Sequence, residues 1–598
     1  MITRTALYHR GENNYCYGYD KNTLHIRVRL AKKEATQVSL RIGDPYKWAS
    51  GGGGGNLNAE GAMGWIGGTT IPMQKEAETE LYEYWVASYM NDTKRFRYAF
   101  IVEDSDEKLL FGEKKIVELE PENEEAALQE MNNFFCMPYM NGADVADIPS
   151  WVNETVWYQI FPERFANGNP DITPKDAVEW GSEPTPSNMM GGDLYGVLDR
   201  LDYLQELGIT GIYFCPIFHA ESNHKYDTID YMEIDPQFGD KAVFKKLVEE
   251  AHKRGIRIML DAVFNHAGWQ SPFFQDVLKN QEASRYKDWF HIKSFPVSHE
   301  AGNYEMFAFC HEMPKFNTEN EECRAYLLDV ARYWVEEFDI DGWRLDVANE
   351  VDHVFWRDFR NAVKAIKPDL YILGELWHDA MPWLQGDQFD AVMDYPVGDA
   401  ITEFICHGKM NAEQYKHAIS EAVVRYPRNM NEATFALLDS HDTDRIVTRA
   451  GGNLDKVKLA YLLLFSYTGS PSIYYGGEIG LEGGADPGCR RAMPWKETEK
   501  PNDFNLFMKK LIHLRKTIPA FRSQTFKWIK ADRSDVLIFC KEADQGDVYF
   551  MINTGNKAVK LQLPEVLDDK LKDLFNEEEI TLPATFELGA NEYYVLQK

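Results

Sequence analysis

The first 120 residues alternate between apolar and polar positions with a period of two, which is typical of strands with one buried face. Turn-rich stretches separate four such segments, at residues 24–30, 37–42, 82–87 and 96–102. Short strands at this spacing predict a β-sandwich over residues 1–120. The glycine run at 51–55 is too flexible for a strand and predicts a loop.

From residue 155 the pattern changes to short apolar runs that alternate with amphipathic segments of helical period. The eight strand candidates are 156–161, 211–216, 257–263, 342–347, 371–375, 391–393, 435–438 and 472–475. We count eight helical segments beside them. Eight βα units predict a closed barrel over residues 151–522, and the acidic stretch at 118–125 predicts a linker over 121–150 before it.

Two further segments complete the predicted architecture. The connection after the third strand, 267–317, is much longer than a βα loop requires and predicts a subdomain over the cleft. Short β segments return at the end of the chain and predict a C-terminal β-sandwich over 523–598. The predicted fold is therefore α/β: a (β/α)8 TIM barrel with a β-sandwich at each end of the chain and a long-loop subdomain after the third strand.

The composition excludes some functions without choosing one. The chain has 64 Lys and Arg against 95 Asp and Glu, a formal charge of -31, which disfavours nucleic acid as a partner. The sequence has neither a bilayer-spanning apolar stretch nor a secretory signal pattern at its start, so we expect a cytoplasmic protein without a membrane partner. The eight cysteines lack metal-ligand spacing and are expected to be reduced thiols.

Polar residues stand at the ends of four predicted barrel strands, where active sites of this fold lie. They are Asp261, Asn265 and His266 at the third strand, Arg344 and Asp346 at the fourth, Glu375 at the fifth, and His441 and Asp442 at the seventh. One polar strand end is more often a helix cap or a loop contact, but four at one face predict a site. The absence of a compact cysteine or histidine cluster favours acid–base or nucleophilic chemistry over a catalytic metal.

Two of these carboxylates have different sequence surroundings. Side chains alternate along a strand, so Arg344 and Asp346 share a face, and the cation is expected to hold down the pKa of Asp346. Glu375 is set among apolar and aromatic residues, which is expected to raise its pKa and to favour proton donation. One ionised and one protonated carboxyl is the arrangement of a glycosidase.

Four segments resemble, in order, the four signature regions of the α-amylase superfamily, glycoside hydrolase family 13. They are 261–266 (DAVFNH), 342–346 (GWRLD), 374–375 (GE) and 441–442 (HD). Segments 8–10, 313–317, 347–353 and 483–491 resemble the subgroup that contains cyclomaltodextrinase, neopullulanase and maltogenic amylase. The resemblance implies a retaining α-glycosidase that hydrolyses α-1,4 bonds of cyclodextrins, short maltooligosaccharides and pullulan, with some transglycosylation. It also implies a homodimer formed through an N-terminal domain like a starch-binding module.

The resemblance assigns roles to particular residues. Asp346 would be the nucleophile, Glu375 the general acid and base, and Asp442 a carboxylate that holds the distorted sugar. Other implied substrate contacts are His266, Arg344, His441, Tyr226, Asp486, Arg490, Glu350 and Trp377. Asp261 and Asn265 would support the site structurally, and Tyr226 would be the stacking platform under the cleaved sugar.

A calcium site is also implied, although the loop that would form it departs from the family pattern. Its candidate ligands are Asn167, Asn169, Asp171, Gly191 and Asp193. Calcium prefers six to eight oxygens with several carboxylates, and two of these side chains are neutral amides. We therefore expect a weak or empty structural site and no cofactor in catalysis.

Two alternatives stay open. The same catalytic residues would serve an α-glucosidase or a glucanotransferase of the same superfamily, and the shape of the subsites separates these enzymes. The other alternative is a non-catalytic carbohydrate-binding protein that has kept the barrel fold of an enzyme. Such a protein would usually lose one of the catalytic carboxylates, whereas Asp346, Glu375 and Asp442 are all present.

Overall fold

The computed structural model describes residues 1–47, 65, 68–500, 502–567 and 570–598. The chain divides into two compact units. The N-terminal unit contains Met1–Asp147, Leu384–Asp387 and Glu413–Asn431, and the barrel unit contains Ile148–Trp383, Gln388–Ala412 and Glu432–Lys598. The glycine run at 51–55, predicted to be a loop, lies outside the described residues.

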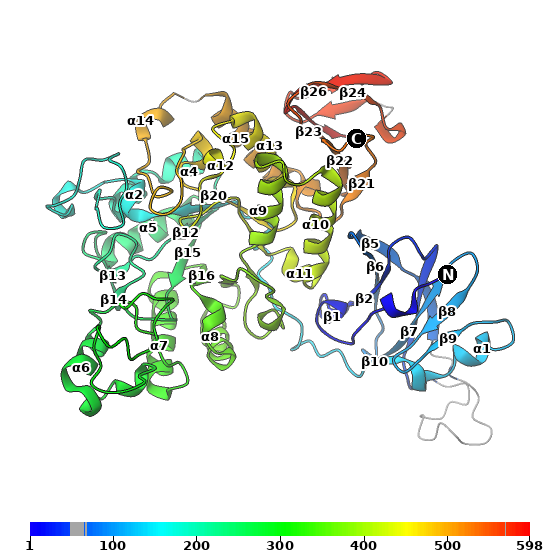
Figure 1. The fold of residues 1–598 in the computed structure, drawn as a ribbon, viewed down its shortest axis with the longest axis horizontal. Helices are drawn as coiled ribbons and strands as arrows, with labels where there is room; N and C mark the ends of the chain where they lie inside the picture. The colour runs from blue at the N-terminus through cyan, green and yellow to red at the C-terminus, as the bar shows by residue number, and fades with distance from the viewer. Residues whose placement is uncertain (48–64, 66–67, 501, 568–569) are drawn as a thin grey trace. The chain divides into compact units, whose positions relative to one another are not determined.

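Eight parallel strands form the centre of the barrel unit (Figure 1). They are β11 (Trp157–Ile160), β12 (Gly211–Phe214), β15 (Arg257–Ala262), β16 (Gly342–Leu345), β17 (Tyr371–Gly374), β18 (Ala391–Val392), β19 (Phe435–Ala436) and β20 (Ser470–Tyr474). The strands pair in the order β18-β17-β16-β15-β12-β11-β20-β19, and a parallel bridge between Met393 and Phe435 joins the two ends of this order. The sheet therefore closes, which confirms the predicted barrel.

The strand residues are buried on both faces, apart from the half-buried Arg257. Burial on both faces explains why these strands read as continuous apolar runs rather than as alternating patterns. The helices that cover them are amphipathic, and several begin at a side-chain cap. Asp240, for example, accepts N–H bonds from Ala242 and Val243 at the start of α5 (Lys241–Lys253).

α-Helices follow most of the barrel strands. They include α3 (Leu194–Asp199), α4 (Leu201–Leu207), α5, α7 (Glu321–Phe338), α8 (His353–Ile366), α9 (Tyr395–Ile401), α13 (Leu454–Ser466) and α15 (Asp503–Thr517). The connection from β17 to β18 contains only the 3-10 helix η9 (Met381–Trp383), so the prediction of eight helical segments is wrong there. Pro382 lacks an N–H, and Gly386 has φ +92°, which explains why no α-helix forms in this connection.

The subdomain predicted after the third strand is present between β15 and α7. It contains α6 (Pro272–Asn280) and the 3-10 helices η6 (Gln281–Ala283) and η7 (Lys287–Trp289). Phe274 packs at its centre, with ring centroids 4.9 Å from Phe290 and 5.1 Å from Tyr304. This small aromatic core gives the long connection a structure of its own.

Two further sheets form the C-terminal part of the barrel unit. The larger has the order β21 (Lys527–Ile529), β22 (Val536–Lys541), β23 (Val548–Asn553), β28 (Tyr593–Gln597), β25 (Leu571–Asp573), β26 (Glu578–Ile580). The smaller pairs β24 (Val559–Gln562) with β27 (Thr585–Leu588). Apolar residues of both sheets, among them Ile538, Met551 and Leu561, share one core, which confirms the C-terminal β-sandwich.

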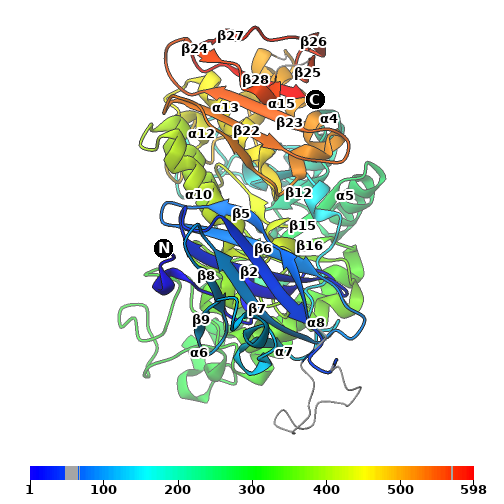
Figure 2. The ribbon, with the colours of Figure 1, turned by 90° about the vertical axis from the view of Figure 1, so that its right-hand side faces the viewer.

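The N-terminal unit is a second β-sandwich. One sheet has the order β1 (Cys16–Gly18), β2 (Leu24–Ala31), β6 (Tyr82–Tyr89), β5 (Gln74–Glu78), of which β2, β6 and β5 are seen side by side in Figure 2. The other has the order β4 (Gly68–Pro72), β3 (Gln37–Gly43), β7 (Phe96–Glu103), β8 (Lys108–Phe111), β9 (Ile116–Glu118). Leu24, Val28, Leu40 and Phe100 belong to the common core, as the alternating pattern predicts.

The segment 121–150 differs from the predicted linker. It contains α1 (Glu124–Ala127) and β10 (Phe135–Met137), which pairs antiparallel with β7. Phe134 and Phe135 are buried, and each packs in an apolar cluster of the N-terminal unit. The N-terminal unit therefore continues to Asp147. Within the described part of the chain, no helix has the length and apolar character that crossing a membrane requires.

Candidate active site

A cavity of about 490 Å³ lies where the barrel strands end. Ten residues that the sequence singled out line it: Tyr226, His266, Asp346, Glu350, Glu375, Trp377, His441, Asp442, Asp486 and Arg490. They come from segments that follow β12, β15, β16, β17, β19 and β20. The barrel therefore brings together side chains that are up to 264 residues apart in the sequence, from position 226 to position 490.

Arg344 lies beneath this cavity and contacts three carboxylates. Its Nη1 is 2.7 Å from Oδ1 of Asp346, and its Nη2 is 2.7 Å from Oε1 of Glu375. Asp261 is opposite Arg344 in the parallel register of β15 and β16, and its Oδ1 is 3.0 Å from the guanidinium. One fully buried cation thus orients carboxylates from three adjacent strands.

The pKa of Asp346 differs from the sequence prediction. Burial raises this pKa well above its ordinary value, Arg344 lowers it, and the negative charges of Glu375 and Asp261 raise it again. Arg344 shares its single charge among three carboxylates, so it offsets only part of the burial effect. The predicted net lowering is therefore wrong, although the contribution of Arg344 has the predicted sign. Burial also raises the pKa of Asp261, to about 6.

Glu375 has two further contacts that fix its carboxyl group. Its Oε2 accepts a hydrogen bond of 3.0 Å from the backbone N–H of Val347, and its Oε1 accepts one of 3.4 Å from the indole of Trp377. Val347 has φ +46°, a left-handed conformation that is strained for a β-branched residue. This conformation directs the backbone N–H of Val347 toward the carboxylate of Glu375.

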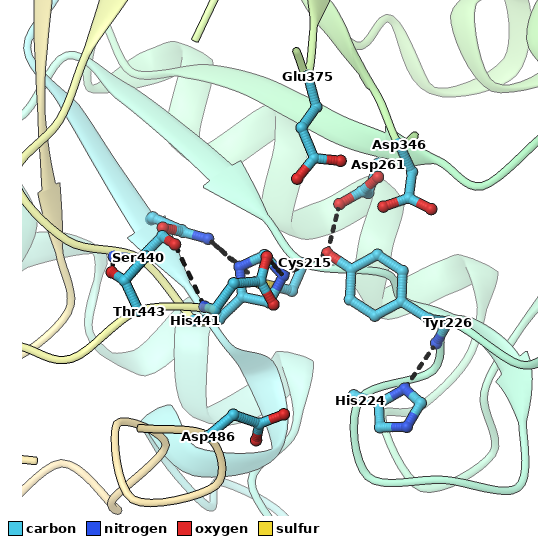
Figure 3. A network of polar contacts seen from close by, with 12 residues as sticks. Cys215, His224, Tyr226, Asp261, Asp346, Glu375, Ser440, His441, Thr443 and Asp486 are labelled. Carbon is cyan, nitrogen blue, oxygen red and sulfur yellow. Dashed lines mark hydrogen bonds and ion pairs between the residues drawn. The ribbon is translucent and has the colours of Figure 1, made fainter. Parts of the chain in front are cut away.

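Tyr226 and His441 form a stacked pair that lies below Glu375 in the view of Figure 3. Their ring centroids are 5.4 Å apart at an interplanar angle of 8°. The hydroxyl of Tyr226 donates to Asp261 at 2.9 Å and lies 2.7 Å from Nε2 of His441. The ring of Tyr226 is therefore held by hydrogen bonds at its tip.

Two of the three histidines that line the cavity, His266 and His441, are neutral hydrogen-bonding groups. Gln159 donates to Nδ1 of His441 at 2.7 Å, which leaves the proton of His441 on Nε2, 3.1 Å from Asp442. Burial lowers the pKa of His441 far below its ordinary value, and it lowers the pKa of His266 to about 3. Neither ring is suited to act as the general acid at neutral pH.

Arg490 connects two acidic residues of the predicted outer subsite. Its guanidinium lies 3.3 Å from Asp442 and 3.0 Å from Asp486. Burial raises the pKa of both carboxyl groups, and Arg490 lowers each of them. On the other side of the cavity, Glu350 lies 3.5 Å from Lys315, which also contacts Asn265. Asn265 and Asp261 contact other protein groups beneath the cavity, as expected of supporting residues.

Five lining residues were not assigned to the site from the sequence: His224, Phe307, Met313, Val347 and Asn349. Phe307 stacks on His266 with ring centroids 5.3 Å apart. It lies in the inserted subdomain, where no strand pattern signals its position. Met313, Val347 and Asn349 stand within segments that carried the family resemblance, and His224 lies two residues before Tyr226, so their position in the sequence was a usable signal.

The proposed calcium ligands do not form a calcium cage. The carboxylate of Asp193 accepts N–H bonds from Gly168, Asn169 and Gly196, and the side chain of Asn169 accepts one from Asp171. These oxygens are therefore already used to cap helices and turns, and the set does not fit calcium coordination. Among the described residues, no group of three or more His, Cys, Asp or Glu side chains is placed to hold a metal ion.

The fold and the cavity together define a class of protein. A (β/α)8 barrel whose strand ends carry convergent carboxylates, oriented by one buried arginine, is an arrangement typical of glycoside hydrolases. Two family models match the chain: "Alpha amylase, catalytic domain" over residues 159–535 and "Alpha amylase, N-terminal ig-like domain" over residues 1–141. The protein belongs to the α-amylase family and is a glycoside hydrolase.

Individual relatives agree with this assignment. The chain is 50% identical to the cyclomaltodextrinase of Geobacillus thermopakistaniensis (strain MAS1), over 96% of this chain and 95% of that one. It is 44% identical to the intracellular maltogenic amylase of Bacillus subtilis, over 99% and 98% of the two chains. A solved cyclomaltodextrinase structure matches with a TM-score of 0.91, at 42% identity over 100% of both chains.

Proposed function

We propose that the protein is a retaining α-glycosidase that hydrolyses α-1,4 bonds in cyclodextrins, short maltooligosaccharides and pullulan, with some transglycosylation. The contact of Arg344 with both Asp346 and Glu375 carries the proposal, since it holds two carboxyl groups in one cavity at 2.7 Å from the same cation. The cyclomaltodextrinase and maltogenic amylase names of the relatives support the choice of α-glucans.

In the first step, the carboxylate of Asp346 attacks the anomeric carbon and forms a covalent glycosyl-enzyme. Glu375 donates a proton to the departing glycosidic oxygen, so the leaving sugar departs as an alcohol. The N–H of Val347 holds Oε2 of Glu375, which keeps the acid oriented toward the bond. Arg344 stabilises the ionised form of Asp346 before attack.

In the second step, Glu375 takes a proton from water, and this water attacks the anomeric carbon and releases Asp346. Two inversions at the same carbon retain the α configuration. A sugar hydroxyl in place of water gives transglycosylation by the same route. The steps use only side chains of this protein.

The remaining lining residues would stabilise the oxocarbenium-like transition state. Asp442 and the Nε2–H of His441 lie within 3.1 Å of each other and would bind sugar hydroxyls of the cleaved ring. Tyr226 would stack against this ring, since its own ring is fixed by Asp261 and His441. Asp486 and Arg490 would bind the next sugar outward, and Glu350 and Trp377 the leaving side.

A comparison of substrates tests the proposed specificity. Purified protein is incubated with β-cyclodextrin, pullulan and soluble starch, and the products are resolved over time. The proposal predicts faster turnover of β-cyclodextrin and pullulan than of starch, and equal activity on starch would contradict it. Release of single glucose units from chain ends would favour an α-glucosidase, and disproportionation without net hydrolysis would favour a glucanotransferase.

A homodimer formed through the N-terminal unit and a cytoplasmic location are also part of the proposal. The match of residues 1–141 to the N-terminal family model supports a separate N-terminal domain, to which we assign the dimer contact. The intracellular relative of Bacillus subtilis supports the location. Sedimentation equilibrium tests the dimer, and a mass of one 69.0 kDa chain at micromolar concentration would contradict it.

A further inference from the structure

A second large cavity, of about 610 Å³, lies in the barrel unit. Three stretches contribute most of its wall: residues 180–183, Leu481, and residues 491–497. Its lining residues and those of the catalytic cavity have no member in common. Its volume is within the range of small-molecule and oligosaccharide pockets.

Two half-buried tryptophans line this cavity. The indole N–H of Trp180 donates to the carbonyl of Met493 at 3.0 Å, and that of Trp495 donates to the carbonyl of Phe165 at 2.6 Å. Both indoles are therefore satisfied on their polar side, which leaves the ring surface for packing.

The two indole rings differ in their aromatic and cationic neighbours. Arg200 covers the ring of Trp495, at 4.1 Å from the centroid, and Tyr203 meets it at an edge. Trp180 stacks on no aromatic ring within the part of the chain that the structure describes. Gly181, the next residue, also lines the cavity, has φ +92°, and has open space where a side chain would begin.

Charged side chains around the cavity balance one another. Glu183 and Glu497 carry two negative charges, and Arg491 and Lys496 carry two positive ones. Arg491 and Glu183 pair at 3.3 Å on the exposed edge. A rim with no net charge and many hydrogen-bonding groups around an indole face suits an uncharged, polyhydroxylated ligand and disfavours an anion or a cation.

We propose that this cavity is a second α-glucan-binding site, in which a sugar ring packs on Trp180 and its hydroxyls bond to Glu183 and Arg491. The choice of an α-glucan rests on the proposed function, whereas the class of uncharged sugar rests on the cavity itself. The wall between the two cavities is firmly held, because Arg164 donates to the carbonyl of Arg490 at 3.1 Å and Tyr475 donates to that of Arg491 at 2.5 Å. Occupation of the second site therefore leaves the catalytic cavity unchanged and retains glucan chains near it.

Calorimetry with maltotriose tests this site in the Asp346→Asn background, where turnover is blocked. The expected result is two binding sites per chain, and one site when Trp180→Ala is added, because loss of the indole weakens that site about tenfold or more. Trp180→Phe keeps a ring and is expected to restore two sites. Trp528→Ala, a matched change at a half-buried tryptophan of the C-terminal sheet, is expected to retain both.

Kinetics separate this site from the catalytic one. In the otherwise unchanged enzyme, Trp180→Ala is expected to leave kcat/KM for maltotriose unaltered and to lower it for long glucan chains. A single maltotriose site in the Asp346→Asn protein, or two sites that persist in Trp180→Ala, would overturn the inference. Trp180-dependent binding in a protein that hydrolyses no α-glucan would contradict the proposed function and leave the second site standing.

Discussion

Asp346 and Glu375 share one cation, because the two terminal nitrogens of Arg344 each lie 2.7 Å from one of the carboxylates. A guanidinium holds its two terminal nitrogens in a rigid plane, whereas a lysine ammonium is a single point charge. The fixed relative position of the two carboxyl groups therefore depends on an arginine at this position. Its third contact, with Asp261, ties the pair to the adjacent strand.

Arg344→Lys is expected to keep the positive charge and to lose the simultaneous contact with Asp346 and Glu375. We expect kcat to fall about 100-fold or more, because breaking a buried charged contact costs roughly 3 kcal/mol. Steady-state kinetics on β-cyclodextrin measure the change. Arg360→Lys is a matched control, since Arg360 pairs with the buried Asp390 at 2.8 Å outside the cavity. A loss in the control equal to that in Arg344→Lys would contradict the bridging role.

If Asp346 is the nucleophile, as proposed, its raised pKa is expected to set the acidic limb of the pH profile. A nucleophile must be ionised, and a pKa above the ordinary 3.8 means that ionisation is lost at a higher pH than in a free aspartate. Activity is therefore expected to fall, as pH decreases, well before pH 4. The pH dependence of kcat/KM measures this limb.

Asp261→Asn tests the cause of that shift. Asp261 contributes a negative charge that raises the pKa of Asp346, and it also takes part of the charge of Arg344. Its neutralisation is expected to move the acidic limb to lower pH. The maximal rate is expected to fall less than in Asp346→Asn, because the nucleophile remains. A limb that stays in place, or that moves to higher pH, would argue against coupling between the two carboxylates.

Tyr226 is expected to act through its ring more than through its hydroxyl. Tyr226→Phe retains the ring and loses the bonds to Asp261 and His441, so we expect a loss of about tenfold in kcat/KM. Tyr226→Ala removes the platform as well and is expected to lose at least another tenfold. Equal activity of the Phe and Ala variants would contradict the stacking role.

A buried lysine in the C-terminal sandwich offers a test of stability apart from activity. Lys541 is fully buried, its Nζ lies 3.6 Å from the ring centroid of Phe526, and it has no hydrogen-bond partner among the described residues. Burial, and then the charge of Arg515, lower its pKa far below 10.5. At pH values between the folded and the unfolded pKa, the unfolded chain therefore binds a proton that the folded protein excludes.

This difference in proton binding determines whether stability rises or falls with pH. Because the pKa in the folded state is depressed, the contribution of Lys541 to stability increases with pH up to about 10.5, the unfolded value. Lys541→Met is expected to raise the free energy of unfolding at pH 7 by about 1 kcal/mol or more and to flatten its rise with pH. Denaturant unfolding at several pH values measures this, with the exposed Lys530→Met as control. A less stable Met variant would contradict the account.

The sequence predicted the barrel because its strands are buried on both faces and so leave continuous apolar runs, such as those of β15 and β17. The strand-end pattern predicted five of the residues that line the cavity, because barrel closure brings strand ends together, and the family resemblance added five more. The net pKa shift of Asp346 was not predictable from Arg344 alone, since it depends on Asp261 and Glu375, which lie 85 and 29 residues away in the sequence.

Other features depend on contacts that leave no local pattern. Phe307 contacts His266 from an irregular segment. Neither the strand nor the helix periodicity of apolar residues therefore marks it as a cavity residue. The cavity at Trp180 is formed by loops that meet only in the folded barrel. The helix missing after β17 does have a local signal, in Pro382 and Gly386, which a count of alternating segments overlooks.

Mass spectrometry of a trapped intermediate tests the central claim most directly. In Glu375→Gln, an activated maltosyl fluoride needs no acid for its first step, and without the base the glycosyl-enzyme should accumulate. Proteolysis is expected to give one peptide that carries a maltosyl group on Asp346. A maltosyl group on another residue, or rapid release of maltose with inverted configuration and no labelled peptide, would contradict the proposed roles of Asp346 and Glu375.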